Sequence, residues 1–239
     1  DRTSAGKTWC RCSDQGVYRQ RNKGASPEAY EPITAAPLAC GGLTAYRAVD
    51  HGRTTLAPMR RQGRVLLIGV GGLGQYAIRY LQLLTDAKVI ALDLAEDKRS
   101  RALALGADEA IGPDEDIAPC DLIIDFIGSD VTLATAAGAV ARKGLVIVVG
   151  LGGGQTNFGL GKVPPEARFM TSFWGTRQQM DELLELARRE PSIMPSVETL
   201  PLSDAQHANR KWFCIGYFQC DDFRKQRCQN RDELKNPPF

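Results

Sequence analysis

The chain lacks the features that mark a membrane or secreted protein. No apolar run approaches the roughly 18 residues that a membrane span requires. Residues 1–24 are polar and basic, without the apolar stretch of a signal peptide. We therefore expect a cytoplasmic protein with no membrane partner.

The chain also lacks an excess of charge of either sign. The 239 residues carry a net charge of only +2, and the basic residues do not gather on one helix face. A nucleic-acid partner is therefore not expected. A hydrophobic content of 43% is ordinary for a globular chain of one large or two small domains.

The cysteines lack a pattern of pairing. There are seven, an odd number, and five of them fall in the terminal segments. These five do not show the Cys-x-x-Cys spacing of a structural zinc site; they are Cys10, Cys12, Cys214, Cys220 and Cys228. We expect free thiols rather than a disulfide framework.

What the chain does have is a glycine-rich run directly after the apolar stretch 65–68. Gly69 permits a tight turn, Gly71 lets the backbone approach a phosphate, and Gly74 lets the next helix pack closely. A strand ending in Gly-x-Gly-x-x-Gly predicts a dinucleotide pyrophosphate site, although methyltransferases and ordinary tight connections share the pattern. The run reads Gly69, Val70, Gly71, Gly72, Leu73, Gly74.

The residues that follow support this prediction. Residues 75–84 have helical spacing, and residues 88–92 form a short apolar strand that ends at Asp93. Asp93 lies 19 positions beyond Gly74, close to the roughly 20 expected for the carboxylate that binds the adenosine ribose. It favours NAD over NADP, although Lys98 and Arg99 lie near it in sequence. The alternative role for Asp93 is a helix N-cap.

Alternating strands and helices continue along the chain. Their continuous apolarity is typical of strands buried on both faces, so we expect a doubly wound, six-stranded parallel sheet of the Rossmann type. The expected strands are 65–68, 88–92, 108–111, 121–126, 145–149 and 168–175; the expected helices are 75–84, 96–106, 131–142 with Asp130 as N-cap, and 177–189; residues 197–205 could add a strand and the start of a helix.

Ligands bind at the carboxyl ends of the strands in such sheets. The glycine run, Asp93, Ile127 with Gly128, and residues 149–151 all follow strand ends, so four loops are expected to meet in one crevice. Glycines 152–154 are interpreted as a flexible loop.

Residues 35–205 resemble the zinc-dependent medium-chain dehydrogenases, specifically the bacterial NAD-dependent alcohol dehydrogenases. The resemblance rests on several motifs together: residues 36–46 (APLACGGLTAY), 68–74 (IGVGGLG), 105–108 (LGAD), 150–153 (GLGG) and 175–177 (GTR). It implies oxidation of a small alcohol, or reduction of an aldehyde, with hydride transfer to or from NAD beside a zinc ion. It also implies a possible homo-oligomer.

The resemblance also implies roles for single residues. Cys40 would be the last of three zinc ligands, Thr44 would lie near the nicotinamide, and Lys98 would touch the adenosine ribose. The backbone around three further residues would hold the nicotinamide carboxamide: Val149, Leu151 and Phe173.

The chain departs from the family before Cys40 and after about Gln206. Only 39 residues precede Cys40, and the two histidines, His51 and His207, have no Gly-His-Glu context and are interpreted as surface or loop residues. Zinc is therefore expected to bind poorly. We expect a fragment with the catalytic domain largely missing, its ends arising from a truncated gene or a shifted reading frame. Its expected parts are a poorly ordered segment 1–34, a cofactor domain 35–190, and a remnant with an unmatched tail 191–239.

The sequence thus predicts an NAD-dependent, zinc-type alcohol dehydrogenase, represented chiefly by its cofactor domain. The main alternative is a non-catalytic dinucleotide-binding module without zinc. A zinc-free quinone reductase relative would prefer NADPH, which Asp93 disfavours, and the strand pattern through residues 145–150 disfavours a methyltransferase.

Overall fold

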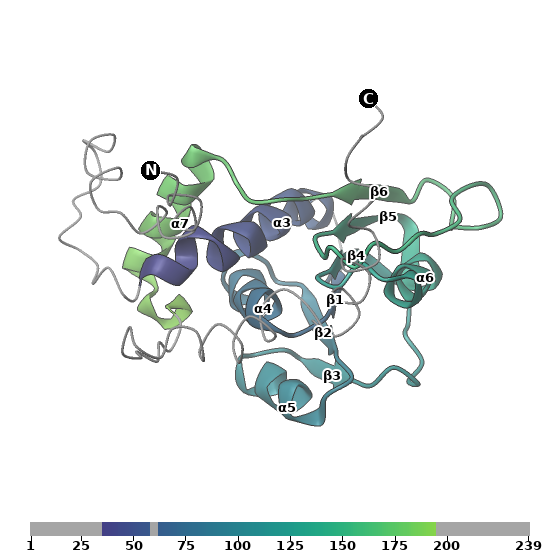
Figure 1. Ribbon diagram of the computed structural model, residues 1–239, viewed down its shortest axis with the longest axis horizontal. Helices are drawn as coiled ribbons and strands as arrows, with labels where there is room; N and C mark the ends of the chain where they lie inside the picture. Colours follow the sequence, from purple (N-terminus) through teal and green to yellow (C-terminus); the bar gives the residue numbers. More distant parts are fainter. Residues whose placement is uncertain (1–34, 58–61, 195–239) are drawn as a thin grey trace, which may run out of the picture. The chain divides into compact units, whose positions relative to one another are not determined.

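The computed structural model describes residues 35–57 and 62–194, which fall within one compact unit of the chain. They form a six-stranded, all-parallel sheet in the order β3-β2-β1-β4-β5-β6, covered by helices (Figure 1). The predicted doubly wound sheet is confirmed. The predictions for residues 1–34 and 195–239, including the strand at 197–205 and the position of His207, lie outside the described residues.

The sheet consists of β1 (Arg64–Ile68), β2 (Lys88–Leu92), β3 (Glu109–Ile111), β4 (Cys120–Asp125), β5 (Val140–Val148) and β6 (Arg168–Thr171). The helices are α3 (Gly41–Leu56), α4 (Gly72–Leu84), α5 (Glu96–Ala104), α6 (Asp130–Ala139) and α7 (Arg177–Arg189), with short 3-10 helices η3 (Ala36–Ala39) and η4 (Pro191–Ile193). None of these helices is long and apolar enough to cross a membrane.

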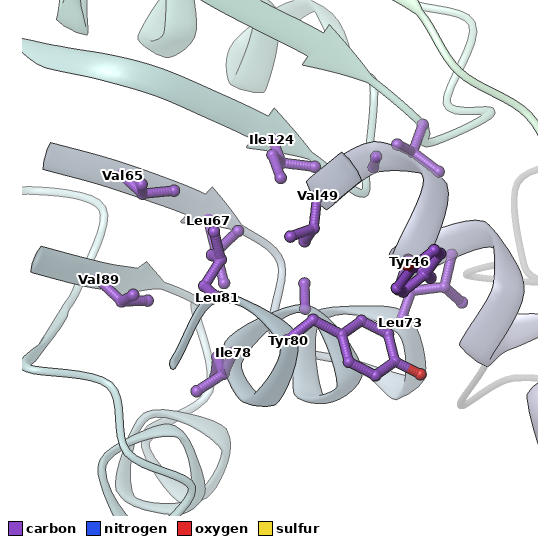
Figure 2. Close-up of a cluster of buried hydrophobic side chains, with 14 of the residues drawn as sticks. Tyr46, Val49, Val65, Leu67, Leu73, Ile78, Tyr80, Leu81, Val89 and Ile124 are labelled. Atoms are coloured by element: carbon purple, nitrogen blue, oxygen red, sulfur yellow. The ribbon is translucent and has the colours of Figure 1, made fainter. Parts of the chain in front are cut away.

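Buried apolar side chains fill both faces of the sheet, as continuous apolar strands require. On one face Leu67 and Ile124 pack with residues of α3 and α4 (Figure 2). On the other face Leu66 and Ile123 pack with alanines of α6. Figure 1 accordingly shows α6 across the sheet from α3 and α4.

The boundary between α6 and β5 differs from the prediction. The helix ends at Ala139, not at residue 142, because β5 already pairs with β4 from Val140. Its N-cap is Ser129, which accepts the N–H of Thr132 in a capping box, so the prediction of Asp130 as N-cap is wrong. The sixth strand also ends early, at Thr171 rather than residue 175.

Helix α3 was not predicted from the sequence as a helix. Its three glycines lower helix propensity, yet Gly52 is needed because a Cβ there would lie 2.4 Å from Leu122 Cδ2. This close approach lets α3 pack on β4. His51 lies in α3 and is half-buried, so it is not a loop residue.

A buried tyrosine joins α3 and α4. Tyr80 is fully buried and lies edge-on to Tyr46 at a ring distance of 5.7 Å (Figure 2). It also stacks on Tyr76 at a ring distance of 6.0 Å. Its hydroxyl has no hydrogen-bond partner among the described residues, and burial raises the pKa of Tyr80. This hydroxyl therefore costs desolvation energy without a compensating bond.

We expect Tyr80→Phe to raise the free energy of unfolding by about 1 kcal/mol, because it removes that unpaired polar atom. Tyr46→Phe is the matched control: it removes a hydroxyl that donates to Glu182 Oε2 at 3.2 Å, so it should lower stability. Urea denaturation measures both. Equal losses in the two variants would contradict the prediction.

Candidate functional site

The glycine turn between β1 and α4 has the geometry that its sequence predicts. Gly69 has a φ of +88°, which favours glycine, and its N–H donates to the Leu92 carbonyl at 2.8 Å. A Cβ at Gly74 would lie 2.3 Å from the Gly69 carbonyl oxygen. The turn can therefore close only with glycine at both positions.

The turn leaves space at the start of α4. Gly71 is the N-cap in an extended conformation, no side chain caps the helix, and no acidic residue lies in its first turn. A Cβ at Gly72 would meet nothing within 4 Å. Open space beside uncapped N–H groups suits an anion.

The Asp93 carboxylate lies against this turn. Its Oδ2 accepts the Val70 N–H at 2.8 Å, its Oδ1 accepts the Ala95 N–H at 3.0 Å, and Lys98 Nζ lies 3.8 Å from Oδ1. Helix α5 has Ala95 as its N-cap with no side-chain cap, so Asp93 is not the N-cap residue. A carboxylate has about four acceptor positions, so it retains capacity for ligand hydroxyls.

The neighbouring Arg99 is engaged by the chain itself. Its Nη1 donates to the carbonyl oxygens of Asp93 and Leu94, both at 2.8 Å. This guanidinium therefore braces the β2–α5 loop.

The loop after β4 depends on a buried acid for which the sequence predicts only a place in a strand. Asp125 is fully buried, and its Oδ1 accepts the N–H groups of Ile127 at 2.8 Å and Gly128 at 3.0 Å. Its main-chain oxygen accepts the N–H groups of Val149 and Gly150. Burial raises the pKa of the Asp125 carboxyl, and these N–H donors oppose the rise. The sequence signal that could have indicated this role is an acidic residue at the end of an apolar strand, two residues before the pair Ile127 and Gly128.

The loop after β5 is hydrogen-bonded to the loop after β4 at two of its glycines. The Gly152 N–H donates to the Ile127 carbonyl at 2.9 Å, and the Gly154 N–H donates to the Gly128 carbonyl at 2.8 Å. Gly152 and Gly154 are thus bonded to the neighbouring loop, whereas Gly153 is exposed and a Cβ there would meet nothing within 4 Å. These bonds hold the loops after β4 and β5 together.

Large apolar side chains stand exposed at this end of the sheet. Val149 is buried, whereas others that follow β2, β4, β5 and β6 are between 39% and 69% exposed. Such exposure marks a surface that meets a ligand or another protein surface. The exposed residues are Leu94, Ile127, Leu151, Phe173 and Trp174.

Cys40 and Thr44 lie at the start of α3. The Thr44 hydroxyl is buried and donates to the Cys40 carbonyl at 2.8 Å, while Cys40 is exposed. A Cβ at Gly175 would lie 2.6 Å from Leu43 Cδ1, so the β6–α7 turn packs directly on this part of α3. The structure thus brings the segment that carries Phe173 close to Thr44.

The described residues do not form a zinc site. Over residues 35–57 and 62–194, no three His, Cys, Asp or Glu side chains are grouped so that they could hold a metal ion. A catalytic zinc needs three protein ligands, and Cys40 alone does not supply them.

Comparisons with known proteins agree with the geometry. The chain is 33% identical over 214 residues to an NAD-dependent alcohol dehydrogenase of Sulfolobus acidocaldarius, covering 84% of this chain and 57% of the relative. The alcohol dehydrogenase structure from Aeropyrum pernix aligns with a TM-score of 0.66 at 29% identity, over 82% of this chain and 59% of that one. Acetophenone reductase from Geotrichum candidum, solved in complex with NAD, aligns with a TM-score of 0.67 at 28% identity, over 78% and 54%.

The chain thus spans little more than half the length of these relatives. Residues 72–189 match the zinc-binding dehydrogenase family. This match begins within the glycine turn, at Gly72, and covers Asp93 and the loops after β4, β5 and β6. Together with the shared fold, it identifies residues 72–189 as a domain of the zinc-binding dehydrogenase family.

Proposed function

We propose that the chain binds NAD at the carboxyl ends of its strands. The observation that carries the proposal is the Asp93 carboxylate, bonded to the Val70 N–H of the glycine turn beside open space at Gly72. The turn would hold the pyrophosphate through its backbone N–H groups, and Asp93 with Lys98 would bind the adenosine ribose. Gly69, Gly71, Gly72, Leu73 and Gly74 make up the pyrophosphate site.

The nicotinamide half would lie over the loops after β4, β5 and β6. Ile127, Val149, Leu151 and Phe173 are the proposed contacts, and the exposed apolar side chains among them suit a flat ring. Thr44 would stand beside the ring, its hydroxyl fixed on the Cys40 carbonyl. When bound, the nicotinamide would accept or supply a hydride.

The proposed reaction is the NAD-dependent oxidation of a small alcohol, or the reverse reduction of an aldehyde. The chain's described part would bind and orient the cofactor and present its ring at the start of α3. The described residues hold no ligand set for a zinc ion. Assembly into a homo-oligomer stays a prediction.

That missing ligand set favours one second candidate, a dinucleotide-binding module that does not catalyse. Bound zinc and turnover of a simple primary alcohol, measured on the purified full chain, separate the two. Stoichiometric zinc with NADH formation supports the dehydrogenase. NADH binding without zinc or turnover supports the module.

Asp93→Asn tests the proposed NAD site. Loss of the charge should weaken NADH binding about tenfold and narrow the preference for NADH over NADPH, since a carboxylate accepts ribose hydroxyls and repels a 2′-phosphate. Fluorescence titration with each nucleotide measures both effects. Asp97→Asn, an exposed acid in the first turn of α5, is the matched control and should change neither. Unchanged NADH affinity in Asp93→Asn would contradict this site.

A further inference from the structure

Four glycines lie in the loop after β5, at residues 150, 152, 153 and 154, and three of them, at 150, 152 and 154, occupy alternate positions. In extended chain, alternate residues face the same side. All three glycines face the segment that follows β4: the nearest atoms to a Cβ at each would belong to residues 127–129. The spacing therefore reflects one continuous contact between two loops.

Three hydrogen bonds join these loops beyond the last paired residues of β4 and β5. Gly152 donates to the Ile127 carbonyl at 2.9 Å, and Gly154 donates to the Gly128 carbonyl at 2.8 Å. Gln155 donates from its N–H to Asp130 Oδ1 at 2.7 Å. We call this arrangement, made of residues 127–130 and 150–155, the loop ladder.

The loop ladder has no room for larger residues at Gly150, Gly152 and Gly154. A Cβ at Gly150 would lie 2.1 Å from the Ile127 carbonyl carbon, and a Cβ at Gly154 would lie 2.2 Å from the Ser129 carbonyl carbon. At Gly152 the distance to the Ile127 carbonyl oxygen would be 2.7 Å. These neighbours are backbone atoms, so relief requires the two loops to separate.

The ladder also reaches the glycine turn. The Ile127 side chain lies over Gly69, where a Cβ would be 2.8 Å from Ile127 Cγ1. Asp125 fixes the same segment by accepting the Ile127 and Gly128 N–H groups. Leu151 stands between Gly150 and Gly152 and is half exposed.

We propose that the loop ladder is a positioning device for the cofactor, holding Ile127 over the glycine turn and Leu151 toward the nicotinamide half. Gly154 and Asp130 are then positioning residues, because they act through Ile127 and Leu151. This inference rests on the proposed NAD site and deepens it. Cofactor affinity should thus depend on Gly154 and Asp130, although neither residue is a proposed cofactor contact.

Gly154→Ala in the full chain tests the steric part. The added Cβ should separate the loops and raise the Kd for NADH about tenfold, the size of a coupling carried through packed neighbours. Gly159→Ala is the matched control in the same connection, since a Cβ there meets nothing within 4 Å. It should keep the Kd of the unaltered chain.

Asp130→Ala tests the ladder without a steric clash, in case Gly154→Ala fails to fold. It removes the acceptor of the Gln155 N–H, whereas Asp130→Asn retains one. We expect weaker NADH binding in Asp130→Ala and recovery in Asp130→Asn. Amide hydrogen exchange without nucleotide should show slow exchange at Gly152, Gly154 and Gln155, lost in Gly154→Ala.

The outcomes separate the two proposals. If the unaltered chain binds NADH and both disrupting variants bind it equally well, the ladder does not position the cofactor, although the NAD site stands. Fast exchange of the three amides in the unaltered chain would overturn the ladder itself. If the unaltered chain does not bind NADH, the proposed function fails and this role fails with it.

Discussion

Gly74→Ala should reduce NADH binding by at least about a hundredfold, because the variant cannot keep the shape of the glycine turn. Its Cβ would lie 2.3 Å from the Gly69 carbonyl oxygen and 3.2 Å from the Gly69 carbonyl carbon. These are backbone atoms, so α4 must move away from β1 or the turn must open. We also expect the free energy of unfolding to fall by about 1–3 kcal/mol. Fluorescence titration with NADH and urea denaturation measure the two effects.

Gly72→Ala separates binding from folding. A Cβ at Gly72 meets nothing, so this change at the start of α4 should leave stability unchanged or raise it by about 0.5 kcal/mol. Its methyl group would enter the space proposed for the pyrophosphate, so NADH affinity should fall. Gly138→Ala, in α6 and equally open, is the control that should alter stability alone. NADH affinity unchanged in Gly72→Ala would place the pyrophosphate elsewhere.

Asp125→Ala should cost about 2–4 kcal/mol of folding stability, because it leaves the Ile127 and Gly128 N–H groups without their acceptor. Asp125→Asn should lose much less folding stability, since its amide oxygen can accept both N–H groups. Urea denaturation at pH 7 compares the two variants. A loss in Asp125→Asn as large as that in Asp125→Ala would show that the charge, rather than the acceptor, holds the loop.

The pH dependence of Asp125→Asn provides a second readout. Burial raises the pKa of Asp125 in the folded chain, so the unfolded chain gives up this proton at lower pH. The stabilisation that comes from protonating Asp125 is therefore fully present at low pH, and it is lost as the pH rises through the raised pKa. Asparagine does not titrate, so the stability of Asp125→Asn relative to the unaltered chain should increase between pH 4 and pH 7. A constant difference across this range would contradict the raised pKa.

The sheet could be predicted because its strands are continuously apolar and the turn after β1 has a sequence signature. Helix α3 could not, since Gly41, Gly42 and Gly52 lower its propensity, and the need for glycine at residue 52 arises from Leu122, which is distant in sequence. The end of α6 was misplaced for a related reason. Residues 140–142 suit a helix, but pairing with β4 makes them strand.

The candidate site was predicted by position but not by its bonds. Sequence spacing placed Asp93 at the end of β2, yet nothing local shows that it accepts the Val70 N–H. The need for glycine at residues 152 and 154 does not show in the sequence, because the segment that they contact lies more than 20 residues earlier. The roles of Cys40 and Thr44 came from the family resemblance, and they remain predictions.

The strand order also bears on how such a protein could acquire a different ligand. Chain connections leave the two central strands, β1 and β4, toward opposite faces: one enters α4 and the other enters α6. The loops that follow β1 and β4 therefore diverge at the middle of the sheet, whatever side chains these loops carry. The crevice between these loops thus follows from the strand order alone and does not depend on the side chains that would recognise a ligand. Substitution within those two loops could change what is recognised while the buried strands stay untouched.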